Sequence, residues 1–155
     1  MEESSAALAA RDKAAELGVD CLSPAGAALL TLLAATLQAR NAVEVGTGTG
    51  VAAVALLTGM VPDGVLTSID VENELQLHAR GILTAAGIPS RRARLIAGSA
   101  LTVLPKLTDG AYDLVFVDGD PLEYVEYVAQ ASRLLRTGGL LVLHHALWQG
   151  KVADP

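Results

Sequence analysis

Three glycines at alternate positions, Gly46, Gly48 and Gly50, follow one short apolar segment and precede a longer one. Glycine has no Cβ atom, so a backbone with this spacing can turn sharply and approach a ligand closely. A helix that begins directly after such a loop presents free N–H groups and the positive end of its dipole. Asp70 ends the next apolar segment, where an acid can accept both hydroxyls of a ribose. The spacing therefore predicts a site for a nucleotide-type cofactor.

The glycine pattern alone does not identify the cofactor, because residues 48–53 also fit the loose dinucleotide fingerprint G-x-G-x-x-G/A. The acids nearby favour one class of ligand. Glu44 lies two residues before the first glycine, and Asp118 and Asp120 follow a later apolar segment. Carboxylates suit a ligand with a sulfonium and an ammonium group better than they suit a pyrophosphate. The alternative is that Glu44 and Asp120 are capping or solvated acids with no ligand.

Length, composition and charge exclude several classes of protein. A chain of 155 residues, 52% of them hydrophobic, suits one domain with a core. The formal net charge of −6 gives no electrostatic footprint for nucleic acid, and no apolar run approaches the roughly 20 residues of a membrane helix. Cys21 is the only cysteine, which excludes an internal disulfide and favours a reducing, cytoplasmic setting.

Short apolar segments alternate with helical ones along the chain, and these elements must position the candidate residues. Strands are predicted at 41–45, 65–69, 94–97, 112–117 and 140–143, and helices at 4–17, 24–38, 50–60, 72–86, 101–107 and 121–136. The helix at 50–60 is apolar nearly all round and is expected to be buried. Continuous apolar strands separated by helices indicate a parallel sheet covered on both faces, a doubly wound α/β fold. We expect one domain over 1–155, with N-terminal helices at 1–40, a Rossmann-like core at 41–145 and a loop-like tail at 146–155.

Four segments together are similar to one enzyme family. They are Glu44–Gly50 (EVGTGTG), Gly64–Asp70 (GVLTSID), Tyr112–Asp118 (YDLVFVD) and Ala146–Trp148 (ALW). In this order and spacing the chain resembles the bacterial branch of the catechol/caffeoyl-CoA-type O-methyltransferases, class I enzymes that depend on S-adenosylmethionine. The resemblance covers nearly the whole chain. It implies a Rossmann-like methyltransferase sheet and transfer of a methyl group to a hydroxyl of a small molecule.

The resemblance also implies a contact for each part of the cofactor. The methionine end is expected at Glu44, Gly46 and Thr47. The ribose is expected at Asp70, the adenine at Ser99-Ala100 and the amino group near Asp120. Leu22 is expected to touch the cofactor through its backbone. The cofactor-binding residues implied in this way are Leu22, Glu44, Gly46, Thr47, Gly48, Gly50, Asp70, Ser99, Ala100, Asp118 and Asp120.

The chain departs from the family where metal and base are expected. Well-known members hold a divalent ion with an acid after the fourth strand and an Asp-Asn pair after the fifth. Asp118 matches the first position, His144-His145 replaces the pair, and Pro121 replaces a lysine often proposed as the base. Magnesium prefers oxygen ligands, so no tight magnesium site is expected.

Asp118, His144 and His145 remain the candidate catalytic residues, with three interpretations open. A histidine could act as general base, since imidazole titrates near neutrality. Two imidazoles with one carboxylate could instead bind Zn, Fe, Ni or Co. Neighbouring strand residues point to opposite faces, so both could ligate only if the chain turns at His144. The third interpretation is an ordinary polar strand end.

The family continues beyond the last residue of this chain through another helix and an antiparallel pair of strands. We therefore expect either a fragment or a fifth strand, 140–143, that forms a bare edge, which a homodimer would cover. The leading hypothesis is an S-adenosylmethionine-dependent O-methyltransferase. The alternatives are an S-adenosylmethionine-binding protein without catalysis and, from another class, an NAD-type Rossmann domain.

Overall fold

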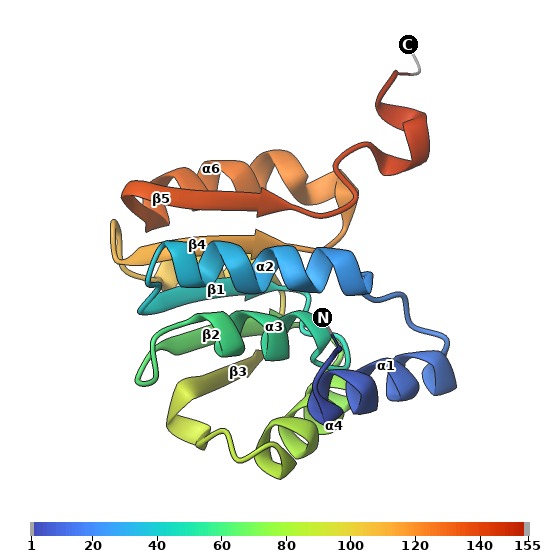
Figure 1. The fold of residues 1–155 in the computed structure, drawn as a ribbon. Coiled ribbons are helices and arrows are strands. Elements are labelled where there is room, and N and C mark those ends of the chain that lie inside the picture. The colour runs from blue at the N-terminus through green and yellow to red at the C-terminus, as the bar shows by residue number, and fades with distance from the viewer. Residues whose placement is uncertain (1, 154–155) are drawn as a thin grey trace.

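Five parallel strands form a central sheet with helices on both faces (Figure 1). The computed structural model describes residues 2–153. The strand order is β3-β2-β1-β4-β5. The strands are β1 (Asn41–Val45), β2 (Val65–Asp70), β3 (Ala93–Ala97), β4 (Tyr112–Val117) and β5 (Leu135–Leu143). The helices are α1 (Ser5–Leu17), α2 (Pro24–Thr36), α3 (Val51–Gly59), α4 (Asn73–Ala85), α5 (Ala100–Val103) and α6 (Tyr124–Leu134).

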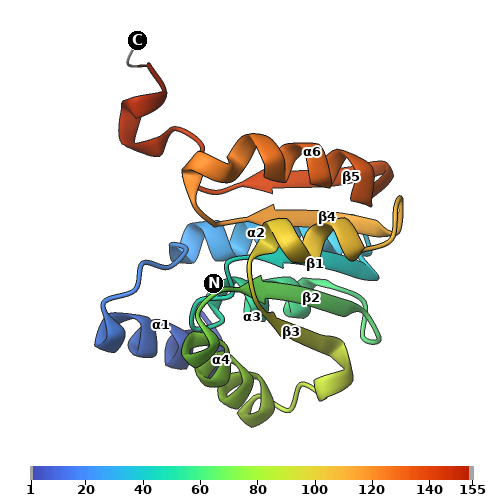
Figure 2. The ribbon, with the colours of Figure 1, turned by 180° about the vertical axis from the view of Figure 1, so that it is seen from behind.

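The two faces of the sheet have separate hydrophobic cores. The first core joins the sheet to α1, α2, α3 and α4, and the second joins it to α5 and α6, which lie in front of the sheet in Figure 2. Helices therefore leave β1 and β4, which are neighbours, toward opposite faces. Such a switch point opens a crevice at the carboxyl ends of the strands, where ligands bind in open α/β sheets. The doubly wound fold predicted from the sequence is confirmed.

The buried helix α3 packs closely on α2. All residues from Val51 to Leu57 are buried, which confirms the expectation from their apolar character. A Cβ atom at Gly59 would lie 2.2 Å from the carbonyl oxygen of Thr31, so this glycine permits the close approach. Thr31 in turn donates its hydroxyl to the carbonyl oxygen of Ala55, at 3.0 Å. The position of α3, and with it the glycine loop that precedes it, depends on this contact.

The sequence-based boundaries are wrong at the junction of α6 and β5. The helix was expected to run from 121 to 136 and the strand to begin at 140. In the structure, Pro121–Glu123 forms a 3-10 turn, α6 ends at Leu134, and β5 already begins at Leu135. Leu135 has extended backbone angles, and the register to β4 shifts between Tyr112 and Leu114, which accommodates the two glycines inside the strand.

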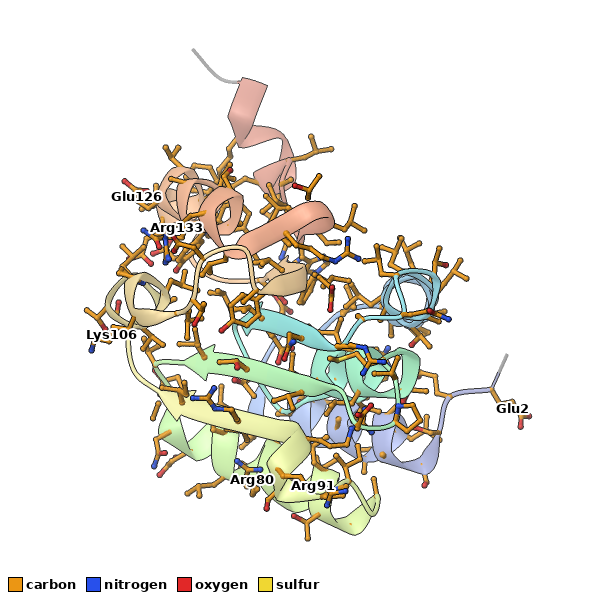
Figure 3. The ribbon with its side chains drawn as sticks, turned by 90° about the vertical axis from the view of Figure 1, so that its left-hand side faces the viewer. Glu2, Arg80, Arg91, Lys106, Glu126 and Arg133 are labelled. Atoms are coloured by element: carbon orange, nitrogen blue, oxygen red, sulfur yellow. The ribbon has the colours of Figure 1, made fainter. Side chains whose placement is uncertain are left out.

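Arginine side chains hold α6 and β5 against the segments beside them. Arg133 donates to the carbonyl oxygens of Leu104, at 2.8 Å, and Leu107, at 2.9 Å, and Figure 3 shows its side chain on the same side of the molecule as Lys106. Arg136 forms an ion pair with Asp113, whose other oxygen accepts the backbone N–H of Arg40 at 2.7 Å. The ion pair between Arg136 and Asp113 ties β5 to β4 at the end of the sheet opposite the site.

The segment after β5 was expected to be a loop. Trp148–Ala153 instead forms 3-10 turns, with a kink at Gln149 and Gly150. Residues 154 and 155 of the expected tail lie outside the described residues. Within residues 2–153, no helix has both the length and the apolar character needed to cross a bilayer.

Candidate functional site

A cavity of about 290 Å³ lies at the carboxyl ends of β1, β2 and β4. Six of the residues expected from the sequence line it, namely Gly46, Asp70, Ser99, Ala100, Asp118 and Asp120. A larger cavity, about 430 Å³, lies between the start of α1 and the end of α3. Its only charged lining residue, Arg92, donates to three backbone carbonyl groups, and that cavity contains no carboxylate. The smaller, acidic cavity is the candidate site.

The glycine loop allows the carboxyl ends of β1 and β4 to lie close together beside this cavity. Gly46, Gly48 and Gly50 have φ angles of +92°, +51° and +100°, which side-chain-bearing residues rarely adopt. A Cβ atom at Gly46 would lie 2.2 Å from the carbonyl oxygen of Asp118, inside van der Waals contact. The loop is also fixed from outside, because Thr49 donates its hydroxyl to the carbonyl oxygen of Ala10 in α1, at 2.7 Å.

Asp70 holds the loop with the oxygens that face the cavity. Its Oδ2 accepts the backbone N–H of Gly48 and its Oδ1 accepts that of Glu72, both at 2.9 Å. Each carboxylate oxygen can accept a further hydrogen bond. The carboxylate can therefore receive two neighbouring hydroxyls while staying fixed by the backbone.

Glu44 has a different environment from the one its sequence position suggests. It is fully buried beneath the glycine loop and does not line the cavity. Its Oε2 accepts the hydroxyl of Ser68, and its Oε1 has no hydrogen-bond partner. Burial raises the pKa of Glu44 to about 8, and the nearby negative charges of Asp118 and Asp70 add to this rise.

Four further expected cofactor residues, Leu22, Thr47, Gly48 and Gly50, do not line the cavity. Thr47, Gly48 and Gly50 belong to the loop that forms its wall. The carbonyl oxygen of Leu22 is already occupied, because it accepts a hydrogen bond from Arg11. Arg11 also forms an ion pair with Glu3, at 2.7 Å.

Two of the lining residues that were not expected from the sequence have polar side chains. Glu123 and Tyr127 cover the cavity from the start of α6, and Tyr127 donates its hydroxyl to the Glu123 carboxylate. Their spacing of four residues places both on one face of a helix. Because Asp120 directly precedes this helical segment, the four-residue spacing could have identified Glu123 and Tyr127 as lining residues from the sequence.

The chain turns directly after β5 and brings both histidines to Asp118. β5 ends at Leu143, the N–H of His144 donates to the carbonyl oxygen of Val117 at 2.8 Å, and His145 has a φ of +56°. The two imidazole rings lie 3.8 Å apart between centroids, and His145 Nδ1 lies 3.6 Å from Asp118 Oδ1. Tyr124 donates its hydroxyl to the carbonyl oxygen of His144, which holds the turn. The two histidines could act together only if the chain turns at His144, and the structure has this turn.

The electrostatics of this cluster follow from partial burial. Burial raises the pKa of Asp118, although the two histidines lower it, and burial lowers the pKa of His144. One ligand atom from each of the three residues lies within 4.8 Å of the others. Two imidazole nitrogens and one carboxylate oxygen do not fit the all-oxygen preference of magnesium. The donor set of this cluster therefore does not support a magnesium-dependent step.

Known proteins are similar to this chain in sequence and in fold. A family model described as O-methyltransferase matches residues 7–155. The Mycobacterium marinum protein named "Putative O-methyltransferase" is 49% identical over 146 residues, which are 94% of this chain and 65% of that protein. A crystal structure of a Corynebacterium glutamicum protein superposes with a TM-score of 0.93 at 34% identity, over 99% of this chain and 73% of that one. The O-methyltransferase TomG from Streptomyces achromogenes, involved in tomaymycin synthesis and crystallised with S-adenosylmethionine, has a TM-score of 0.93 at 31% identity, over 99% of this chain and 71% of TomG.

Proposed function

Because the chain belongs to the O-methyltransferase family, we propose that it binds S-adenosylmethionine and transfers its methyl group to a hydroxyl of a small molecule. The observation that carries this proposal is the acidic cavity at the switch point, walled by the glycine loop and Asp70. The S-adenosylmethionine bound to TomG supports the choice of cofactor. Four lining carboxylates, on Asp70, Asp118, Asp120 and Glu123, suit a cationic ligand and disfavour the pyrophosphate of NAD.

The cofactor is proposed to lie across the carboxyl ends of the strands. Asp70 accepts the ribose hydroxyls, and Ser99 and Ala100 border the adenine. The loop at 46–50 borders the methionine end, with Asp120 near its ammonium group. Glu44 acts on that end by charge from behind the loop, because its carboxyl group is fully buried. This assignment accounts for the negative wall without an additional cation.

Asp118, His144 and His145 are proposed as the catalytic group. Asp118 lines the cavity, and His145, whose side chain is 53% exposed, lies against it. As the acceptor oxygen forms a bond to the methyl carbon, the carbon–sulfur bond breaks and the sulfur becomes neutral. The hydroxyl proton passes to an imidazole, and Asp118 stabilises the imidazolium that forms. His144 keeps the turn in place through its backbone contacts.

We also propose that the protein forms a homodimer and is cytoplasmic. β5 is an edge strand of the described sheet, and a second copy of this chain pairing along it gives a homodimer. The single cysteine fits a cytoplasmic location.

Calorimetry with Asp70→Ala tests the cofactor assignment. The variant removes the ribose acceptor and leaves the hydroxyls without a partner, so S-adenosylmethionine binding should weaken by about 1–3 kcal/mol. Asp12→Ala, at an exposed position on α1, is the control and should bind as the wild type does. Unchanged affinity in Asp70→Ala, or tighter binding of NAD than of S-adenosylmethionine, would contradict the assignment.

Turnover separates an enzyme from a binding protein. Wild-type protein should methylate a catechol-like hydroxyl compound, and His145→Ala should lose most of this rate while it still binds the cofactor. A chain that binds S-adenosylmethionine but methylates no such acceptor would favour the alternative, a cofactor-binding protein without catalysis.

A further inference from the structure

Four buried polar side chains form a hydrogen-bonded row beneath the glycine loop. In order they are Gln76 on α4, Thr47 in the loop, Ser68 on β2 and Glu44 on β1, and none is more than 4% exposed. Gln76 is the member that the proposed cofactor contacts do not explain. A buried amide is costly unless its groups find partners, so its position requires a reason.

The neighbours of Gln76 determine which way its amide points. Nε2 lies 3.1 Å from the carbonyl oxygen of Ile96 and 3.3 Å from that of Ser68. Backbone carbonyl oxygens only accept hydrogen bonds, so the nitrogen of the amide must face them. The same Nε2 lies 3.0 Å from Thr47 Oγ1. Thr47 therefore accepts from Gln76, and its own hydroxyl hydrogen must point elsewhere.

The orientation of the Gln76 amide determines which groups donate and which accept in the rest of the row. Thr47 Oγ1 lies 2.6 Å from Ser68 Oγ, which is the acceptor available to the Thr47 hydrogen. Ser68 then donates to Oε2 of Glu44. If Glu44 carried a proton on Oε2, both hydroxyls would have to reverse, and the Thr47 hydrogen would have no acceptor in the row. A proton on Oε1 would leave the row unchanged, but that O–H group would have no acceptor among the described residues. The row therefore favours a Glu44 that accepts on Oε2 and leaves no position for a proton that is fully hydrogen-bonded.

The charged groups that act on Glu44 are all anions. They are Asp70 at the end of β2 and Asp118 at the end of β4, while α3, which covers one face of the sheet, has no charged residue. The hydroxyl of Ser68 is thus the one protein donor to the Glu44 carboxyl among the described residues. A cation in the adjacent cavity is the complementary charge that this arrangement lacks.

We propose that Gln76 is a positioning residue for cofactor binding, which acts through Thr47 and Ser68 to keep Oε2 of Glu44 a hydrogen-bond acceptor and so favours ionisation of Glu44 when the cofactor binds. This inference rests on the proposed function, because a buried anion there attracts only a cationic ligand such as S-adenosylmethionine. Gln76 touches neither the cavity nor the reacting atoms. Gln76 instead affects whether the cofactor binds beside a charged or a neutral Glu44.

The test is the dissociation constant of S-adenosylmethionine, measured by calorimetry from pH 6 to 9.5. Wild-type affinity should rise with pH as Glu44 ionises. Gln76→Leu frees Thr47 and allows the reversed row, which favours the neutral acid. The midpoint of the pH dependence should then move up by about one pH unit, with about tenfold weaker binding near pH 7.5. Glu44→Gln measures the dependence that belongs to other groups, including the amine of the cofactor.

A double-variant comparison separates the relay from simple packing. Ser68→Ala breaks the row, so adding Gln76→Leu to it should change neither the affinity nor the pH midpoint further. Leu83→Val, a buried change on the same helix, is the matched control. It should lower the melting temperature and leave the pH midpoint unchanged.

Three results would overturn the inference. Gln76→Leu could lower the melting temperature without moving the midpoint, or its effect could add fully to that of Ser68→Ala. Glu44→Gln could keep the wild-type pH dependence. In each case wild-type binding stands and the proposed function survives. Wild-type protein that binds no S-adenosylmethionine at any pH would overturn the proposed function, and this inference with it.

Discussion

At the residue scale, the acids of the site differ in their exposure to a ligand. Asp70 and Asp118 face the cavity, where a ligand can reach their oxygens, whereas Glu44 lies fully buried beneath the loop. A buried carboxyl group costs stability when it ionises. The stability of the protein should therefore depend on pH through Glu44.

The substitution Glu44→Gln tests this dependence. The pKa of Glu44 is about 8 in the folded protein, against an ordinary value of 4.5. Between these values the folded state keeps a proton that the unfolded state has lost, so wild-type stability falls as pH rises. Glutamine cannot ionise, so the variant should gain on the wild type from about pH 5 to pH 8. Urea unfolding without cofactor measures the gap, and a gap that stays constant with pH would refute the prediction.

The residues at the end of β5 predict how the protein responds to metal ions. His144 and His145 stand where oxygen ligands are expected, so magnesium should bind weakly. Methyl transfer should persist in EDTA, and added magnesium should not raise it. Activity that disappears with EDTA and returns with magnesium would contradict the prediction. Restoration by zinc, cobalt or nickel alone would identify the three residues as a ligand set for those ions.

At the element scale, the site depends on how closely the loops after β1 and β4 approach. Gly46→Ala would place a methyl group 2.2 Å from the carbonyl oxygen of Asp118 and also strain a backbone with φ of +92°. We expect a loss of about 3 kcal/mol or more, together with loss of cofactor binding.

Gly48→Ala is the matched control for that substitution. Gly48 also has a positive φ, of +51°, but nothing lies within 4 Å of a Cβ atom there. It should cost only about 1–2 kcal/mol, from backbone strain alone. Denaturant melts compare the two variants, and equal losses would show that the contact with Asp118 has no special importance.

At the scale of the whole molecule, the two edges of the sheet differ. β3 carries Arg94, which is exposed and discourages pairing with another chain, whereas Leu140 to Leu143 of β5 are all apolar. We expect this chain to form a dimer or a larger assembly, or to gain stability when an added segment covers β5. Light scattering tests the first outcome, and thermal melting beside an extended chain tests the second. A monomer that melts as high as the extended chain would refute both.

The local features of this protein follow from its sequence alone. Continuous apolar segments between helices predict the parallel sheet, and the glycine spacing with Asp70 predicts the loop and its acid, because these are properties of short stretches of backbone. Ser4 and Ser23, each before a helix, cap α1 and α2 as such residues do. The boundary of α6 with β5 was mispredicted, because pairing with β4 extends Leu135 against its local helical context.

Only the tertiary structure decided which candidate residues share one environment. Glu44 and Asp120 look alike in the sequence, yet Glu44 is fully buried and Asp120 lines the cavity. His144 and His145 reach Asp118 only because the chain turns after β5. Gln76 joins Glu44 through Thr47 and Ser68, which come from two separate segments. Such relations depend on distances between segments remote in sequence, which packing of the whole chain sets.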